Sequence, residues 1–581
     1  MTTWDEEVDI IVIGSGGGAM TAALVAKDRG SKVLVLEKSS LFGGSTAISG
    51  GSIWIPNNHL MAKANLSDST EEGLAYLRGI TSGQVADELL QAYVESSPEV
   101  VAYLEENSPV HFEITPDYPD YYPHVEGNKQ GGRTLESQIF NLRKLGKHGK
   151  ELRVPGPHLL ILGRWMIRSP QARTMVSASL KSRLAIIRSF ASYLLNPKRS
   201  FARRDTRLTL GNALCGALRL ALMERGVPLW LESPVTKLIN EDDRVTGVEA
   251  TRGNRQIRIR ARQGVIVAAG GFDKNPDLRK THHISADCAV WSSGSPENTG
   301  DAITMGLEIG ASLGNMKEAW WMPTTMVPGN LLPWYAKGSW WTEQSLEQGK
   351  DFPWFLLPER SLPGSIIVDA SGSRFTNEAA PYLDVGHAQL EHHRKNGKAI
   401  PAFQVADHRF HMRYPLGPIM FSVPTKKFVQ SGFLKKADSI EELAEQCGID
   451  PQGLRNEIER YNASARQGKD PDFHRGATAI DRYYGDSIVK PNPCIAPIEK
   501  PPFYAIKVVP GDLGTKGGLR TDIHAQVLRE DGRPIPGLYA TGNCSASVMG
   551  PTYPGAGGTI GPAMTFGYRA ARHATSARAS A

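Results

Sequence analysis

The chain has 581 residues, which is too long for a single hydrophobic core, so we expect roughly two or three domains. It is 40% hydrophobic and 22% charged, as in soluble globular proteins, and no apolar run reaches the roughly eighteen residues that a membrane-spanning helix needs. The net charge of +6 is small for this length. The five cysteines form no Cys-x-x-Cys pair, so neither a disulfide framework nor a metal site is predicted.

The first predicted element is a strand at residues 10–13, because four consecutive apolar residues are typical of a parallel strand buried on both faces. A helix is predicted at residues 17–28 and a second strand at 33–36, which ends on Glu37. Between the first strand and the helix lies the Gly-x-Gly-x-x-Gly/Ala pattern of a dinucleotide site, whose candidate binding residues are Gly14, Ser15, Gly16, Gly18 and Ala19.

This order of strand, glycines, helix, strand and acid predicts a dinucleotide whose phosphates lie at the helix N-terminus. Glu37 follows the glycines by about twenty residues, where a carboxylate accepts hydrogen bonds from the ribose hydroxyls. An acidic residue at this point argues against a 2′-phosphate, so NAD or FAD is expected rather than NADP.

A second loop rich in small residues follows Glu37, and an NAD enzyme has no need of it. Its backbone N–H groups and hydroxyls are suited to lie against a flat, polar ligand. The loop resembles the one that follows the ribose-binding Glu in flavoproteins of the succinate dehydrogenase/fumarate reductase type, and this resemblance implies FAD. The candidate residues are Lys38, Ser39, Gly43, Gly44, Ser45, Thr46, Ser49, Gly50 and Gly51.

Residues 68–97 are predicted to be helical from the spacing of their apolar side chains. A loop bracketed by prolines follows at residues 118–123, with the sequence Tyr-Pro-Asp-Tyr-Tyr-Pro. Proline keeps such a loop stiff, which suits holding a phenol in place, although tyrosines that merely pack a loop would give the same pattern.

The segment from residue 160 to residue 204 has ten basic residues and no acidic one, with apolar residues every three or four positions near its centre. This pattern is typical of a helix at a membrane interface, so attachment to a membrane surface through residues 158–207 is one hypothesis. An amphipathic helix packed on the protein itself is the alternative. No nucleic-acid motif accompanies the charge, so no nucleic-acid partner is expected. The scattered, unpaired cysteines suit a reducing compartment, so we expect a cytoplasmic protein.

A helix is predicted at residues 211–226, followed by strands at 227–232, 234–239, 245–250 and 256–259 and by a buried strand that begins at 264. The buried strand ends in small residues, as expected where a backbone passes under the dinucleotide. Asn298 is predicted to cap a helix that begins near Asp301. The candidate cofactor residues of this part are Val235, Ala269, Gly270, Asn298 and Asp301.

Between residues 320 and 420 aromatic side chains are so dense that walls for a large apolar ligand are predicted. Among them are Trp320, Trp321, Trp334, Tyr335, Trp340, Trp341 and Phe355. Residues 438–468 are predicted to be helical.

The end of the chain again contains glycine-rich segments, and a closing helix is predicted at residues 563–574. Its N–H groups are suited to stabilise negative charge on a cofactor. We therefore expect one FAD-binding domain from residues 1–319 and 511–581 and a catalytic domain from residues 320–510. The C-terminal candidates are Gly542, Asn543, Gly558, Thr559 and Ile560.

Taken together, these motifs resemble the 3-ketosteroid Δ1-dehydrogenases, which belong to the fumarate reductase-like FAD superfamily. The matching segments extend over nearly the whole chain: Gly14-Ser-Gly-Gly-Gly-Ala, Phe42-Gly-Gly-Ser-Thr, Gly51-Ser-Ile-Trp-Ile-Pro, Asp120-Tyr-Tyr, Asn377-Glu-Ala-Ala-Pro-Tyr, Asp512-Leu-Gly-Thr-Lys-Gly-Gly and Thr552-Tyr-Pro-Gly-Ala-Gly. Ala556 stands where the family commonly has proline.

The resemblance implies an α/β fold, with a Rossmann-like FAD-binding domain built from both chain ends and an inserted α+β catalytic domain. It implies desaturation of C1–C2 in a 4-en-3-one steroid and an external electron acceptor such as a quinone. Ser45 and Thr46 stand where members with covalent flavin have histidine, so non-covalent FAD is expected.

The resemblance also assigns roles to three tyrosines and a glycine. Tyr553 and the Gly557 N–H would hold the ketone oxygen, and Tyr382 would take the C2 proton with Tyr121 beside it. Alternatives are a ketosteroid Δ4-(5α)-dehydrogenase, a fumarate reductase-like enzyme, which would need Arg and His to clamp two carboxylates, and a non-catalytic flavoprotein at a membrane surface.

Overall fold

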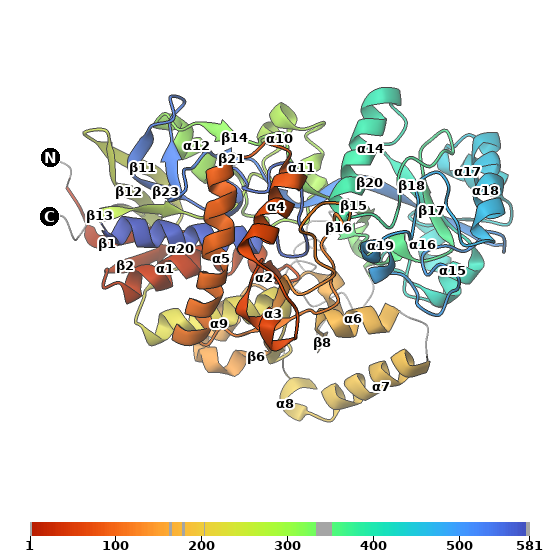
Figure 1. Ribbon diagram of the computed structural model, residues 1–581, viewed down its shortest axis with the longest axis horizontal. Helices are drawn as coiled ribbons and strands as arrows, with labels where there is room; N and C mark the ends of the chain where they lie inside the picture. The colour runs from red at the N-terminus through yellow and green to blue at the C-terminus, as the bar shows by residue number, and fades with distance from the viewer. Residues whose placement is uncertain are drawn as a thin grey trace.

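The computed structural model describes residues 3–161, 165–176, 180–200, 202, 204–332 and 351–576. Of the residues singled out above, Trp334, Tyr335, Trp340 and Trp341 lie outside these ranges. Figure 1 shows two β-sheets with their helices side by side, and both chain termini lie at the edge of the first sheet.

The first sheet is built around β1 (Glu6–Ile13), which pairs in parallel with β2 (Val33–Leu36) on one side and with β13 (Arg255–Val267) on the other. From the C-terminal part of the chain, β23 (Pro534–Ala540) pairs in parallel with β13. Both ends of the chain therefore contribute to one sheet, as the sequence predicted. The other strands are β10 (Leu229–Trp230), β11 (Val235–Glu241), β12 (Arg244–Arg252) and β22 (Gln526–Leu528).

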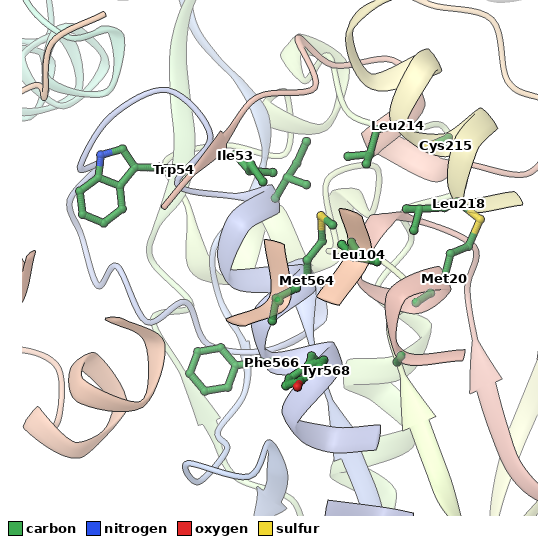
Figure 2. Close-up of a cluster of buried hydrophobic side chains, with 14 of the residues drawn as sticks. Met20, Ile53, Trp54, Leu104, Leu214, Cys215, Leu218, Met564, Phe566 and Tyr568 are labelled. Atoms are coloured by element: carbon green, nitrogen blue, oxygen red, sulfur yellow. The ribbon is translucent and has the colours of Figure 1, made fainter. Parts of the chain in front are cut away.

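The helices that pack beside this sheet come from distant parts of the chain. They are α1 (Gly17–Asp28), α5 (Asp87–Asn107), α9 (Leu210–Glu224) and α20 (Ile560–Ser576). Helices α1 and α20 approach closely because Gly18 has no side chain. A Cβ at this position would lie 2.6 Å from the Ala563 carbonyl oxygen. Figure 2 shows the core between them, where Met20 of α1, Leu214 and Leu218 of α9 and Met564 of α20 are buried together.

Shorter elements complete this part of the protein. The helices are α2 (Gly44–Ala47), α3 (His59–Lys63), α4 (Thr70–Thr81), α10 (Pro276–His282), α11 (Cys288–Trp291) and α12 (Asp301–Glu308). The strands are β3 (Ile53–Trp54), β4 (Phe112–Ile114), β5 (Thr134–Ser137), β6 (Phe140–Asn141), β9 (Arg207–Leu208), β14 (Leu313–Gly314) and β21 (Gly518–Leu519).

The second sheet has the strand order β16-β15-β20-β18-β17, with β19 paired to β20. Its strands are β15 (Ala319–Val327), β16 (Phe352–Phe355), β17 (Ser365–Val368), β18 (Ala402–Ala406), β19 (Lys435–Ala437) and β20 (Phe503–Thr515). Its helices are α14 (Tyr382–Asn396), α15 (His408–Arg413), α16 (Lys426–Gln430), α17 (Ile440–Cys447), α18 (Pro451–Ala465) and α19 (Ala479–Tyr483).

The helical prediction for residues 68–97 is confirmed for most of the segment, which forms the two helices α4 and α5. Ser82 and Gly83 adopt left-handed backbone φ angles of +47° and +77° and end α4. The prediction for the cap of the helix near Asp301 was wrong. Asn298 does not cap α12, whose N-cap is Gly300 without a side-chain hydrogen bond. The Asn298 amide donates instead to Ser45 Oγ at 3.0 Å and to Asp273.

The basic segment contains α6 (Ser169–Val176), α7 (Leu180–Leu194) and α8 (Pro197–Ser200), together with the short strands β7 (Leu160–Ile161) and β8 (Trp165–Met166). In Figure 1, α7 and α8 lie along the lower edge of the molecule. Leu184, Ile187 and Leu195 expose 57%, 63% and 83% of their surface. No helix in the described part of the chain is both long and apolar enough to cross a bilayer.

Candidate active site

A single large cavity runs from the turn between β1 and α1 to a group of buried tyrosines. At the turn, Gly14 has a backbone φ of +105°, and a Cβ there would lie 2.3 Å from the Ala268 carbonyl oxygen. A Cβ on Gly16 would meet only the Thr46 hydroxyl, at 3.5 Å, so its backbone is open to close approach by a ligand. The N-terminus of α1 has no side-chain cap, which leaves the helix end suited to an anion.

Most of the residues predicted to bind a cofactor line this cavity. They are Gly14, Ser15, Gly16, Gly18, Ala19, Glu37, Lys38, Gly44, Ser45, Thr46, Ser49, Gly50, Gly51, Val235, Ala269, Gly270, Asn298, Asp301, Gly542, Asn543, Thr559 and Ile560. Ser39, Gly43 and Gly558 are not among the lining residues. Ser39 and Gly43 instead donate backbone hydrogen bonds to lining residues, and Gly558 packs against Pro554.

Glu37, which follows directly after β2, is held in place by two hydrogen bonds. Ser15 Oγ donates to its carboxylate at 2.6 Å, and the Ser39 N–H donates at 2.9 Å. Burial raises the pKa of Glu37, while these two donors and the nearby Arg153 oppose that rise. The carboxylate is therefore fixed in one orientation at the cavity wall.

The loop after Glu37 is anchored to α1 and to the segment before α12. The Gly17 N–H donates to Thr46 Oγ1 at 3.1 Å, and the Ser295 N–H donates to Ser45 Oγ at 3.2 Å. Lys38 Nζ donates to Asp301 at 2.7 Å, so these two predicted cofactor residues pair with each other. The loop therefore forms one wall of the cavity, with serine and threonine rather than histidine at positions 45 and 46.

Three phenols meet at the other end of the cavity. The ring centroids of Tyr121 and Tyr553 are 5.3 Å apart, those of Tyr382 and Tyr553 are 5.3 Å apart, and those of Tyr121 and Tyr382 are 6.0 Å apart. Burial raises the pKa of Tyr553, while the nearby Tyr382 and Thr559 hydroxyls and the Gly557 backbone N–H oppose that rise. All four residues that the sequence singled out as catalytic thus share one site.

Each phenol comes from a different part of the chain. Tyr382 is the first residue of α14, and Tyr553 lies in the loop before α20. Tyr121 is tied to that loop, because its N–H donates to the Pro554 carbonyl at 3.0 Å. Gly557 has a φ of +102° and lies so close to Ile53 that a Cβ would approach its backbone to 2.4 Å. This close packing fixes the direction of the Gly557 N–H.

Burial raises the pKa values of Tyr121 and Tyr382 well above the usual value near ~10, and it also raises the pKa of Tyr553. A hydrogen bond of 3.3 Å joins the hydroxyls of Tyr121 and Tyr118, and another of 2.9 Å joins those of Tyr118 and Tyr484. In the unliganded site the phenols are therefore protonated at neutral pH and make good hydrogen-bond donors.

Several cavity residues were missed by the sequence reasoning. Tyr118 and Tyr484 extend the phenol group, and Arg153 forms an ion pair with Glu297 at 2.7 Å beside Glu37. His158 and Leu159 also line the cavity, although they lie in the segment predicted to attach to a membrane. Because that segment was interpreted from its basic charge, His158 and Leu159 were not predicted to line the cavity. Of the missed residues, only Tyr118 lies in a segment that the sequence had singled out, the proline-bracketed loop.

The cavity fits FAD. Its glycine turn, the N-terminus of α1 and the buried Glu37 match a diphosphate and a ribose. Asn543 accepts a hydrogen bond of 3.3 Å from Trp320, whose ring packs on Tyr553, so this residue links the cofactor part of the cavity to the phenols. No group of three or more His, Cys, Asp or Glu side chains arranged to hold a metal is found in the described residues.

Comparison with known proteins agrees with this site. The FAD binding domain family matches residues 9–560. The 3-oxosteroid 1-dehydrogenase of Mycobacterium tuberculosis is 40% identical, with 98% of each chain covered. The crystal structure of 3-ketosteroid Δ1-dehydrogenase from Sterolibacterium denitrificans in complex with 1,4-androstadiene-3,17-dione is 44% identical, with a TM-score of 0.92 over 98% of this chain and 100% of that one.

A more distant structure shares the fold alone. The 3-ketosteroid Δ4-(5α)-dehydrogenase of Rhodococcus jostii is 22% identical, with a TM-score of 0.64 over 99% of this chain and 98% of the other. The comparisons therefore favour the Δ1 enzymes over the Δ4 alternative.

Proposed function

The chain belongs to the FAD-dependent 3-oxosteroid 1-dehydrogenase family, and from this premise we propose that its three phenols and the Gly557 N–H perform the desaturation of ring A. The observation that carries the proposal is the meeting of Tyr121, Tyr382 and Tyr553 at one end of the FAD-type cavity. FAD, when bound, supplies the acceptor for the C1 hydride.

In this proposal the Tyr553 hydroxyl and the Gly557 N–H donate hydrogen bonds to the C3 ketone oxygen of the steroid. The two groups lie close together, since the Gly557 N–H opposes the rise that burial causes in the pKa of Tyr553. Each donor strengthens its bond as the oxygen gains enolate charge, which lowers the barrier by about 3 kcal/mol for a well-placed donor.

The phenolate form of Tyr382 then accepts the C2 proton, after the phenol has released its own proton. Its pKa is raised by burial, so its phenolate needs neighbouring hydroxyls to be formed at all. Tyr121 stands beside it, and Tyr118 and Tyr484 continue the row of hydroxyls. We therefore assign Tyr121 the role of stabilising the charge on Tyr382.

The direct test is anaerobic titration of the yellow holoenzyme with androst-4-ene-3,17-dione, followed by identification of the product. Bleaching of the flavin with formation of the 1,4-diene is the expected result. A 4-en-3-one product from a 5α-steroid, with no reaction of the 4-ene substrate, would instead assign the Δ4 activity. A flavin that stays yellow with both ketones would refute catalysis on ketosteroids.

We further propose that a quinone is the external electron acceptor and that α7 holds the protein at an anionic membrane surface. The support for the second point is that Leu184 and Ile187 in α7, and Leu195 directly after it, are exposed apolar side chains. The surrounding segment has no acidic residue from 160 to 204. Sterols and quinones both partition into membranes, so such attachment would place the cavity near both substrates.

Two measurements test these points. The reduced enzyme should be reoxidised by menaquinone incorporated in vesicles, and an unchanged reduced spectrum would exclude this acceptor. The protein should sediment with vesicles containing phosphatidylglycerol more than with pure phosphatidylcholine. The double variant Ile187→Glu, Leu195→Glu should remain in the supernatant with normal activity; equal sedimentation of the variant would contradict the role of α7.

A further inference from the structure

Part of the cavity wall is formed by apolar residues around a single imidazole. His158 and Leu159 from the 157–159 turn lie there with Phe355 and Leu357. The His158 ring centroid is 3.8 Å from that of Phe355 and 6.1 Å from that of Trp354. The imidazole is thus enclosed by aromatic rings at the cavity wall.

Neither ring nitrogen of His158 has a hydrogen-bond partner in the described part of the chain, although both nitrogens are buried. Leaving buried polar atoms unpaired is unfavourable, and most such atoms in folded proteins find a partner. Burial lowers the pKa of His158 to about 3, so at neutral pH the ring is uncharged and has one N–H donor and one acceptor nitrogen. The adjacent Phe355, Leu357 and Leu159 side chains have no N–H or O–H group to offer.

The contact of His158 with Phe355 of β16 relates it, through the second sheet, to the phenols of the cavity. Trp320, near the start of β15, has its ring centroid 4.8 Å from that of Tyr553. Phe355, which contacts His158, pairs with Thr324 on the same strand. Four residues of a strand span about 13 Å, which is comparable with the length of four fused rings. A steroid whose ketone lies at Tyr553 can therefore extend toward His158.

We propose that His158 is a specificity-determining residue that donates a hydrogen bond to an oxygen at the D-ring end of the steroid, opposite the reacting ketone. The inference rests on the proposed function and adds to it a residue that distinguishes 3-ketosteroids with a carbonyl or hydroxyl group at C17 from steroids with only hydrocarbon there. The ligand oxygen accepts a hydrogen bond from the imidazole N–H, which has no partner among the described residues.

A matched pair of substrates isolates this contact. Androst-4-ene-3,17-dione and androst-4-en-3-one differ only in the C17 oxygen, so kcat/KM is measured for both with the holoenzyme. The wild type should prefer the dione by about tenfold, as expected for one hydrogen bond. In His158→Phe the preference should fall to about one, with turnover of the monoketone retained. His158→Gln, which keeps an N–H donor, should restore part of the preference.

Phe355→Leu is the matched control, because it changes the same wall without removing a donor. It should alter kcat/KM for both ketones by the same factor. A wild type that does not distinguish the two ketones, or a His158→Phe variant that keeps the full preference, would overturn the inference. Failure of the proposed function is distinguishable, since then neither ketone would reduce the flavin of the wild type.

Discussion

The side chain of Lys516 donates a hydrogen bond of 2.6 Å to the carbonyl oxygen of Thr552, the residue directly before Tyr553. The same ammonium lies 4.2 Å from the ring centroid of Trp320, whose ring packs on Tyr553 at 4.8 Å. Lys516 is only 1% exposed. A buried cation therefore holds both the backbone and the ring neighbour of the proposed ketone-binding tyrosine.

Replacement of this cation should weaken the ketone site. Lys516→Met keeps a long, unbranched side chain but loses the hydrogen bond and the cation–π contact, so Tyr553 is free to shift. We expect kcat to fall by about tenfold or more, because misplacing a catalytic donor by a fraction of an ångström is costly. Steady-state kinetics with androst-4-ene-3,17-dione, corrected for bound flavin, measures the effect.

The matched control is Lys507→Met, because Lys507 lies on the same strand β20 but is exposed. It should leave kcat unchanged. Burial lowers the pKa of Lys516 to about 7, so its charge is lost as the pH rises through that value. The ratio of wild-type kcat to Lys516→Met kcat should therefore be larger at pH 6 than at pH 9. A ratio that does not vary with pH would show that the charge has no part in the effect.

Tyr553→Phe removes one of the two donors proposed for the ketone oxygen. Loss of a single donor of this kind typically lowers kcat by about 100-fold to 1000-fold. Single-turnover bleaching of the flavin in a stopped-flow instrument measures the step directly. The flavin spectrum of the resting variant should stay normal, and a rate within a few-fold of the wild type would contradict the assignment.

Tyr382→Phe should keep bound FAD and lose nearly all turnover, because no other group is assigned to take the C2 proton. Since burial raises the pKa of Tyr382 well above ~10, wild-type kcat should rise with pH across the neutral and alkaline range. The residual activity of the variant should lack this rise. Tyr539→Phe serves as the control, because Tyr539 bonds to His573 outside the cavity.

The flavin should be released when the protein is denatured. Ser45 and Thr46 offer no imidazole for a covalent link, and their hydroxyls accept hydrogen bonds from Ser295, Asn298 and Gly17. After precipitation with trichloroacetic acid, we expect all the yellow colour in the supernatant and FAD as the released species. Flavin retained in the pellet would contradict the prediction of non-covalent binding.

Local signals in the sequence were sufficient for the cofactor half of the site. The glycine pattern before α1 and Glu37 after β2 lie within thirty residues, so strand, turn and helix geometry relates them without reference to the rest of the fold. Their motifs, together with the tyrosine motifs near the C-terminus, also identified the family. The ends of helices could not be predicted in this way. A single residue in the left-handed conformation, such as Ser82, ends a helix even where the spacing of apolar residues continues.

The tertiary structure alone decided which distant side chains share a neighbourhood. Tyr382 lies 261 residues after Tyr121 and 171 residues before Tyr553. A resemblance to a known family singles out these residues, but only the packing of the chain shows that their rings lie together. No sequence motif assigned a role to Lys516 or His158. The burial of the Lys516 ammonium and the lack of a partner for the His158 nitrogens depend on the residues packed around them. Burial and partner geometry arise when separate segments pack together, and the one-dimensional order of residues does not record them.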